Sequence, residues 1–225
     1  MHIEILTEDR SGQCLIEHVM PKLAGPYGDP HTWRCHGYRG LGRIPKGLSP
    51  ASDPSHRILL AELPRVLRGY QKTPGVDAVV IVLDTDQRDC AAFLGELLAL
   101  AASCDASGKT MFRLAVEEME AWYLGDHAAL LRAYPRARKQ ILNDYIQDSV
   151  CGTWEKLADV IHPGGAKAVR QSGWPLPGQL KHEWANRIGP FLEPDGNHSP
   201  SFGKFRDGLR RLFRSGHAPS SPRPP

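Results

Sequence analysis

The stretch VDAVVIVLDTDQ, at residues 76–87, constrains the fold more than any other part of the chain. It is an apolar run rich in β-branched residues, and Asp77 carries its only charge before the end. A strand with one wet face would alternate polar and apolar residues, so this run predicts a central strand that is covered on both faces. Asp84 and Asp86 follow at its carboxyl end, where open α/β sheets place their ligand sites.

Asp84 and Asp86 are two residues apart at this strand end. Both carboxylates can therefore face one crevice and share a divalent cation. Aspartates that follow a strand also serve as helix N-caps or turn residues. The spacing alone leaves both interpretations open.

Two further predicted strands, at residues 2–7 and 110–116, also end in carboxylates. These are Glu8 and Asp9 after the first strand, and Glu117, Glu118 and Glu120 after the second. Three acidic strand ends on one edge of a parallel sheet would repel one another unless a cation lay among them. The recurrence therefore favours a cation site at this edge.

The remaining pattern predicts an α/β fold. Helix-period apolar residues at 15–23, 55–72 and 89–102 alternate with the strands, and residues 32–38 supply a fourth strand. This order predicts a Rossmann-like, mainly parallel four-stranded sheet with right-handed crossovers, flanked by helices. Ser11 and Gly12 are expected to cap the first helix, and Pro21 is expected to kink or end it.

The C-terminal part is expected to be helical and to pack on an α/β core at residues 1–125. Within it, residues 121–160 look helical, and residues 162–179, rich in Gly and Pro, look like a loop. Ser199 and Pro200 begin a last helix as N-cap and first helical residue. The helical region is expected to span residues 126–214, with a disordered tail at 215–225.

Two groups of basic residues are candidates for contacts with the phosphates of a nucleic acid. Arg39, Arg43 and Lys46 lie in a glycine-rich loop that matches no nucleotide-binding motif. Lys204, Arg206, Arg210 and Arg214 lie along the predicted last helix. Each group could position a phosphate backbone or simply form a solvated surface.

Composition excludes some classes of protein. The chain of 225 residues has five cysteines without a CxxC pair, no basic-then-apolar leader and a net charge of only +3. No apolar run approaches the ~18 residues of a membrane span. We therefore expect a cytoplasmic protein with reduced thiols, no membrane contact and no structural zinc.

Four segments in order resemble a known family. A glutamate ends the first strand and a hydrophobic strand ends in DTD, as in the Toprim domain of topoisomerases, bacterial primases and OLD-type nucleases. The chain is more closely similar to a Toprim-like bacterial family of unknown function. Besides the DTD segment, the matching pieces are TEDRSGQCLIEHVMPKL at 7–23, VEEMEAWYLGD at 116–126 and HSPSFGKFRDGL at 198–209.

The resemblance implies a Mg²⁺- or Mn²⁺-dependent nuclease. Glu8 would be the catalytic glutamate of the first strand, and Asp84 and Asp86 would bind the metal with Glu118 or Glu120. Some members of such families work beside an ATPase partner in antiphage defence. The chain departs from the pattern after Glu8, where many relatives have glycine and this sequence has Asp9 and Arg10. No tyrosine stands where a topoisomerase nucleophile would.

Three functions are thus open. The first is a metal-dependent phosphodiesterase that acts on DNA or RNA. The second is a non-catalytic Toprim-like module that binds a partner ATPase or nucleic acid. A homo-oligomer is a possible state of the protein under either function. The third is a phosphatase or nucleotidyl enzyme that uses the DTD motif differently. It ranks last because phosphatases of the haloacid dehalogenase type have this motif after their first strand, with a threonine where this chain has Arg88.

Overall fold

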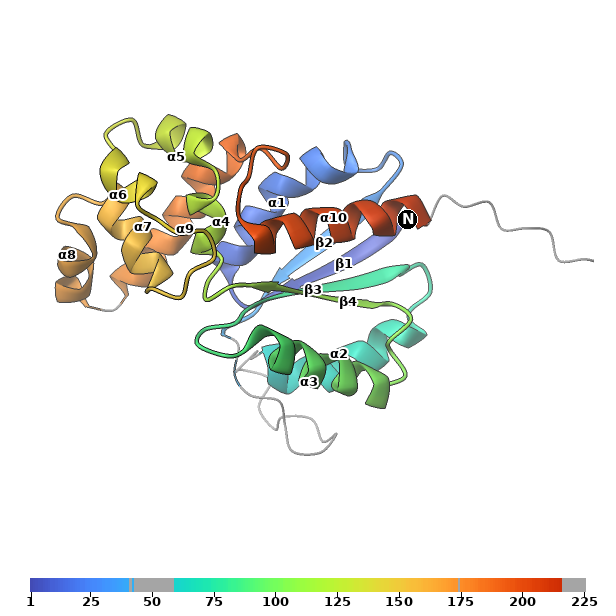
Figure 1. Ribbon diagram of the computed structural model, residues 1–225. Helices are drawn as coiled ribbons and strands as arrows, with labels where there is room; N and C mark the ends of the chain where they lie inside the picture. The colour runs from blue at the N-terminus through green and yellow to red at the C-terminus, as the bar shows by residue number, and fades with distance from the viewer. Residues whose placement is uncertain (41, 43–58, 174, 216–225) are drawn as a thin grey trace, which may run out of the picture.

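The fold is built on a four-stranded parallel sheet. The computed structural model describes residues 1–40, 42, 59–173 and 175–215. Within these residues the strand order is β2-β1-β3-β4, and every neighbouring pair is parallel (Figure 1). The strands are β1 (His2–Thr7), β2 (Thr32–Gly37), β3 (Ala78–Asp84) and β4 (Thr110–Ala115).

The strand β3 is central and covered on both faces, as its apolar run predicts. Its residues Ala78 to Leu83 are all buried. Val80 and Val82 face one hydrophobic core, while Val79, Ile81 and Leu83 face the other. The predicted α/β class with a parallel sheet is confirmed.

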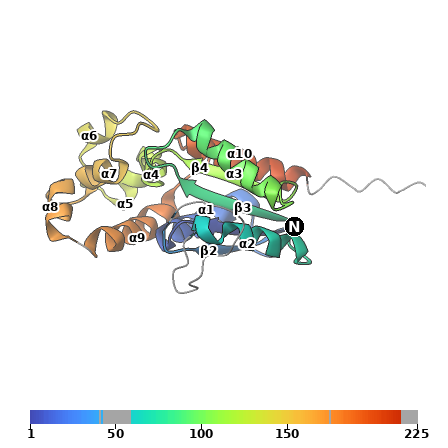
Figure 2. The ribbon, with the colours of Figure 1, turned by 90° about the horizontal axis from the view of Figure 1, so that it is seen from below.

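Helices cover the two faces of the sheet. On one face lie α1 (Arg10–Ala24) and α10 (Pro200–Ser215), and on the other lie α2 (Leu59–Lys72) and α3 (Cys90–Ser103) (Figure 1). Figure 2 shows the same arrangement from below, with α2 and α3 in front. The helix α10 comes from the far end of the chain, so the core on its face joins both ends of the sequence.

The strands point toward a cluster of short helices. The helices α4 to α9 lie beyond the carboxyl ends of the sheet (Figures 1 and 2). They are α4 (Glu120–Leu124), α5 (His127–Ala133), α6 (Lys139–Asn143), α7 (Thr153–Ile161), α8 (Gly165–Ser172) and α9 (Leu176–Ile188), followed by a 3₁₀ turn at Gly189–Phe191. The expected helical stretch at 121–160 is therefore four separate helices, α4 to α7, joined by turns.

Two sequence-based expectations about helices are wrong, and one of the two alternatives for Pro21 is excluded. Residues 162–179 are not a loop, because they contain α8 and the start of α9. The N-cap of α1 is Asp9, whose Oδ1 accepts a hydrogen bond of 2.7 Å from the amide of Gly12. Pro21 does not end that helix, which continues to Ala24.

The last helix begins as predicted and is tied to the helical cluster. Ser199 caps it and Pro200 is its first residue. The carboxylate of Asp148 accepts hydrogen bonds from the Ser199 hydroxyl at 2.7 Å and from the Ser201 amide at 2.6 Å. Trp122 stacks on Phe205 of the same helix, with 5.1 Å between ring centroids. Much of the segment at 198–209 thus serves to dock α10.

None of the helices in the described part of the chain is long and apolar enough to cross a membrane. The five cysteines are free thiols, two of which, Cys14 and Cys104, are buried.

Replacing Asp148 should loosen α10. We expect Asp148→Ala to lower the free energy of unfolding by about 2 kcal/mol, because it removes charged hydrogen bonds at a helix start. Asp148→Asn keeps one acceptor oxygen and tolerates the positive φ of this position, so its loss should be smaller. Urea unfolding followed by circular dichroism measures both, and equal losses for the two variants would contradict this role.

Candidate functional site

The parallel register brings the ends of three strands to one edge of the sheet. Thr7 of β1 pairs with Val82 of β3, and Asp84 pairs with Ala115 of β4. Glu8, Asp84 and the acidic segment after β4 therefore gather at the same edge, as the sequence predicts for a parallel sheet. This edge faces the helical cluster (Figure 2).

The environment of Asp84 is unfavourable for a charged carboxylate. Its Oδ1 is shielded from solvent and accepts no hydrogen bond within the described residues. Burial raises the pKa of Asp84 well above its ordinary value, and the negative charges of Glu8 and Glu120 raise it further. A buried carboxylate oxygen without a donor is costly, so this position favours either a proton or a cation.

The other aspartate of the DTD motif behaves differently. Asp86 has a positive φ of 50°. Its side chain is 60% exposed and lies 3.5 Å from Arg88. The structure therefore does not bring Asp86 into the buried part of the cluster.

Thr85, between the two aspartates, is structural. Its side chain is buried, and its Oγ1 accepts a hydrogen bond of 2.8 Å from the amide of Glu117. Its own amide donates to the carbonyl of Ala115 at 3.1 Å. These bonds join the ends of β3 and β4. They therefore fix the position of Asp84 relative to the glutamates that follow β4.

Glu117 is fully used by the fold. Its carboxylate accepts hydrogen bonds from the amides of Cys151, Gly152 and Thr153 at 2.9 to 3.1 Å. The hydroxyl of Thr153 donates to it as well. Burial raises the pKa of Glu117, but these hydrogen bonds outweigh the effect and lower it overall. This glutamate holds the start of α7, and the donors of residues 151–153 occupy most of its acceptor sites.

Glu118 and Glu120 share a lysine that sequence reasoning missed. Nζ of Lys181, on α9, lies 3.0 Å from Oε1 of Glu118 and 3.4 Å from Oε2 of Glu120. Glu120 is buried, which raises its pKa to about 7 although Lys181 opposes the rise. Burial lowers the pKa of Lys181, but the surrounding carboxylates of Glu120, Glu118 and Asp84 raise it overall.

The helix that carries Lys181 could have been predicted from its apolar pattern. Leu180, Trp184 and Ile188 recur at helical spacing and are all buried in α9. Pro177 and Gly178 lie just before these residues. Because Pro and Gly are typical of loops, composition predicts a loop where the helix begins. No local signal, however, indicates that α9 returns to the acidic edge.

A cleft opens beside the acidic edge between α1 and α9. It has a volume of about 700 Å³ and is lined by Asp9, Arg10, Ser11, Pro175, Gly178, Gln179 and His182. Asp9 belongs to both regions, because its charge also raises the pKa values of Asp84 and Glu120. A cleft of this size accommodates a nucleotide-sized ligand. Arg10 and His182 are the basic side chains that would meet it.

The basic residues predicted to contact phosphate fall into different environments. Arg39 is exposed just after β2, whereas Arg43 and Lys46 lie outside the described residues. On α10, the side chains of Arg206 and Arg210 are held by carboxylates. Arg210 makes two hydrogen bonds to Asp195 at 2.6 and 2.9 Å, and Arg206 bonds to Asp207 at 2.8 Å. Arg214 is exposed at the end of the helix.

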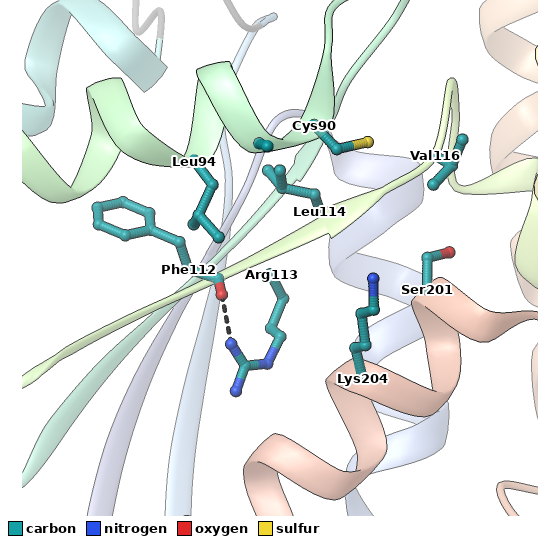
Figure 3. A pocket seen from close by; sticks show the side chains of 9 residues that line it. Cys90, Leu94, Phe112, Arg113, Leu114, Val116, Ser201 and Lys204 are labelled. Atoms are coloured by element: carbon teal, nitrogen blue, oxygen red, sulfur yellow. Dashed lines mark hydrogen bonds between the residues drawn. The ribbon is translucent and has the colours of Figure 1, made fainter.

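Lys204 lines a second pocket. Figure 3 shows this pocket of about 280 Å³ between β4, α3 and α10, with Lys204 extending from α10 toward β4. Its walls also include Arg113, whose guanidinium donates to the carbonyl of Phe112 at 2.6 Å. Val116, which precedes Glu118 by two residues, also lines the pocket. A cationic pocket thus adjoins the turn that carries the acidic segment.

The cluster is suited to a cation only in part. The buried Oδ1 of Asp84 would gain from a cation, and carboxylate oxygens are the ligands that Mg²⁺ prefers. Within the described residues, however, no three His, Cys, Asp or Glu side chains are arranged to hold a metal ion together. Mg²⁺ often takes one or two carboxylates and completes its shell with water and phosphate oxygens. Asp84 could supply one such carboxylate, whereas Glu118 and Glu120 are engaged by Lys181.

Comparisons with known proteins identify no relative. No protein-family model, no curated protein and no solved structure matches the chain.

Asp84 should destabilise the metal-free protein above acidic pH. A carboxyl with a raised folded-state pKa costs nothing below its ordinary value of 3.8, and its cost grows as pH rises toward the folded-state pKa. We therefore expect Asp84→Asn to raise the free energy of unfolding by about 1–3 kcal/mol at pH 8 with a chelator present. The gain should shrink toward pH 4.5.

Chemical unfolding at the two pH values measures this dependence. Asp86→Asn is the matched control, because Asp86 is exposed and its replacement should change stability little at either pH. A loss of stability in Asp84→Asn at pH 8 would contradict the strained environment described for this side chain.

Proposed function

We propose that the protein is a Toprim-like, metal-dependent nuclease that hydrolyses phosphodiester bonds of nucleic acid in the cytoplasm. The observation that carries the proposal is the buried Oδ1 of Asp84, which lacks a donor in the described chain while Glu8 and Glu120 add negative charge. Natural proteins rarely leave a buried carboxylate in this state unless a ligand relieves it. The Toprim resemblance of the sequence points to the same residues.

Asp84 and Glu8 would hold Mg²⁺ or Mn²⁺. The ion would polarise a phosphate oxygen and neutralise the charge that develops during in-line displacement. Asp86 is exposed in the turn after β3. It could reach the ion only through a bridging water molecule or after a movement of this turn. The Toprim likeness also suggests an ATPase partner and a role in antiphage defence for this chain.

Basic side chains around the acidic edge would position the substrate. Arg10 lines the same cleft as Asp9, and Lys204 lines the same pocket as Val116. Arg206 and Arg210 are weaker candidates, because Asp195 and Asp207 already neutralise them. We therefore assign the phosphate contacts chiefly to Arg10 and Lys204.

A second function is favoured by a separate observation. Lys181 already neutralises Glu118 and Glu120, and Glu117 is committed to the start of α7. An acidic edge whose carboxylates are already neutralised by a lysine and by backbone amides needs no metal ion. Such an edge is compatible with a module that only binds an ATPase partner or nucleic acid. Calorimetric titration with Mn²⁺ separates the two functions, because the binding module need not take up metal at Asp84.

Cleavage should depend on Asp84. We expect Asp84→Asn to reduce Mn²⁺-dependent cleavage of single- and double-stranded DNA and RNA by about 100-fold or more, because a Lewis-acid metal contributes several kcal/mol to such reactions. Glu96→Gln on the exposed side of α3 is the matched control and should cleave at the wild-type rate. Equal activity of Asp84→Asn and wild type would refute the assignment.

Arg10 and Lys204 should contribute to the salt dependence of nucleic-acid binding. Replacing either residue with alanine should weaken binding and reduce the log–log salt slope by roughly one, as for a lost phosphate contact. Fluorescence anisotropy with a labelled oligonucleotide and a chelator measures this. Lys167→Ala, on the exposed face of the distant α8, is the control, and an identical effect of all three changes would indicate non-specific attraction only.

A further inference from the structure

The pocket at the edge strand β4 has the features of a small-molecule site. This strand is the last in the sheet order β2-β1-β3-β4. The pocket of about 280 Å³ lies where α3 and α10 pack on opposite faces of the sheet (Figure 3). Pockets for small ligands typically begin at about 300 Å³. The pocket is therefore suited to one small molecule rather than to a length of polymer.

Most of the pocket wall is apolar. Leu94 of α3 and Leu114 and Val116 of β4 line it and are partly buried, and the buried Phe112 contributes as well. Leu94 and Leu114 also pack against the core on the α3 side of the sheet. These side chains offer no hydrogen bonds, so hydroxyl groups of a ligand would be left unpaired against them. The wall suits a compact apolar or aromatic group.

Two basic side chains reach the same pocket. Lys204 extends into it from α10, and Arg113 comes from β4 (Figure 3). Among the described residues neither side chain has an ion-pair partner. Arg206 and Arg210 of α10 are, by contrast, paired with aspartates. The pocket thus holds two positive charges for which the described part of the chain supplies no counter-ion.

The guanidinium of Arg113 is held in place and is only partly satisfied. It donates to the carbonyl of Phe112 at 2.6 Å, while its Nε is shielded from solvent and meets no acceptor in the described chain. It packs against Gly208 of α10, where a Cβ atom would collide with it. Burial and the charge of Arg211 both lower the pKa of Arg113. An anion in the pocket would offset this unpaired, partly buried charge.

The charges and the wall together indicate the class of ligand. A phosphate monoester carries roughly 1.5 to 2 negative charges at pH 7, which matches two cations better than the single charge of a carboxylate. Guanidinium and ammonium groups both bind phosphate. Pockets that take a single nucleotide hold its base between aromatic or apolar side chains. A sugar phosphate would instead place its hydroxyl groups against Leu94 and Leu114.

We propose that this pocket binds a nucleoside monophosphate, with the phosphate at Lys204 and Arg113 and the base against Leu94 and Leu114. A free nucleotide and the phosphorylated end of a strand present the same chemistry to it. The inference goes beyond the proposed function, which requires only that Lys204 attract a phosphate backbone. It involves no metal ion, so binding is measured in the presence of a chelator.

Isothermal titration calorimetry on the full chain tests the class of ligand. The probes are AMP, adenosine, ribose 5-phosphate and inorganic phosphate. We expect wild type to bind AMP at least about 10-fold more tightly than each of the others, because each lacks either the base or the phosphate. No binding of AMP, or equal affinities for AMP and inorganic phosphate, would overturn the inference.

Three variants test the location of the site. Lys204→Met removes a cation at an exposed position, and Ala91→Trp fills the pocket from an exposed position of α3 without changing its charge. Each should weaken AMP binding by about 10-fold or more. Lys167→Met, at an exposed position of α8, is the matched control for loss of one positive charge and should bind AMP like wild type.

Circular dichroism establishes that each variant is folded. Wild-type affinity for AMP in folded Ala91→Trp would overturn the location, as would equal losses in Lys204→Met and Lys167→Met. If Ala91→Trp does not fold, the comparison of the two lysine variants decides the question alone.

A 5′-phosphorylated dinucleotide separates the two sources of the nucleotide. Affinity equal to that of AMP supports the end of a strand as the occupant, and affinity at least about 10-fold lower supports the free nucleotide. The result is also independent of the proposed function. A wild-type protein that binds AMP but cleaves no nucleic acid would refute the nuclease and support this inference, and cleavage without AMP binding would do the reverse.

Discussion

The parallel pairing of β1, β3 and β4 is the constraint on which the site depends. Parallel strands end at a common edge, so any carboxylate that follows a strand must share that edge with the others. Here Glu8, Asp84 and the segment from Glu117 to Glu120 meet in this way. Both faces of the sheet are closed by helices, and the helical cluster of α4 to α9 stands in front of the edge (Figure 1). Like charges are thereby concentrated where little water can screen them.

The fold relieves most of this repulsion by local means, and it uses a different means at each residue. Asp9 caps α1 through the amide of Gly12. Glu117 receives the amides at the start of α7, where the helix dipole also favours a negative charge. Glu118 and Glu120 receive the ammonium of Lys181. Asp84 keeps a buried oxygen, Oδ1, that accepts no hydrogen bond within the described residues.

Sequence reasoning reached those parts of the site that depend on short-range patterns. The apolar run before Asp84 identified a strand covered on both faces, and the order of elements identified a parallel α/β sheet. The local pattern could not distinguish Glu117, which serves the fold, from Glu118 and Glu120, because the distinguishing donors lie 34 or more residues further along the chain. It also treated Asp84 and Asp86 as a pair, whereas the positive φ at Asp86 turns that residue outward. Lys181 was missed because Pro and Gly precede its helix and because the contact spans 61 residues to Glu120.

The contrast between Glu117 and Asp84 bears on function more than either residue alone. The two carboxylates follow neighbouring strands and are joined through the Thr85 side chain, so the fold could supply donors to both. Glu117 is satisfied by backbone amides, which shows that this edge can build a neutralising environment. Asp84 is instead placed close to further negative charge from Glu8 and Glu120. A carboxylate that lowers stability, next to another whose charge is fully stabilised by hydrogen bonds, is typical of a functional site. Under the proposed function, a divalent cation at Asp84 would convert that local strain into binding energy.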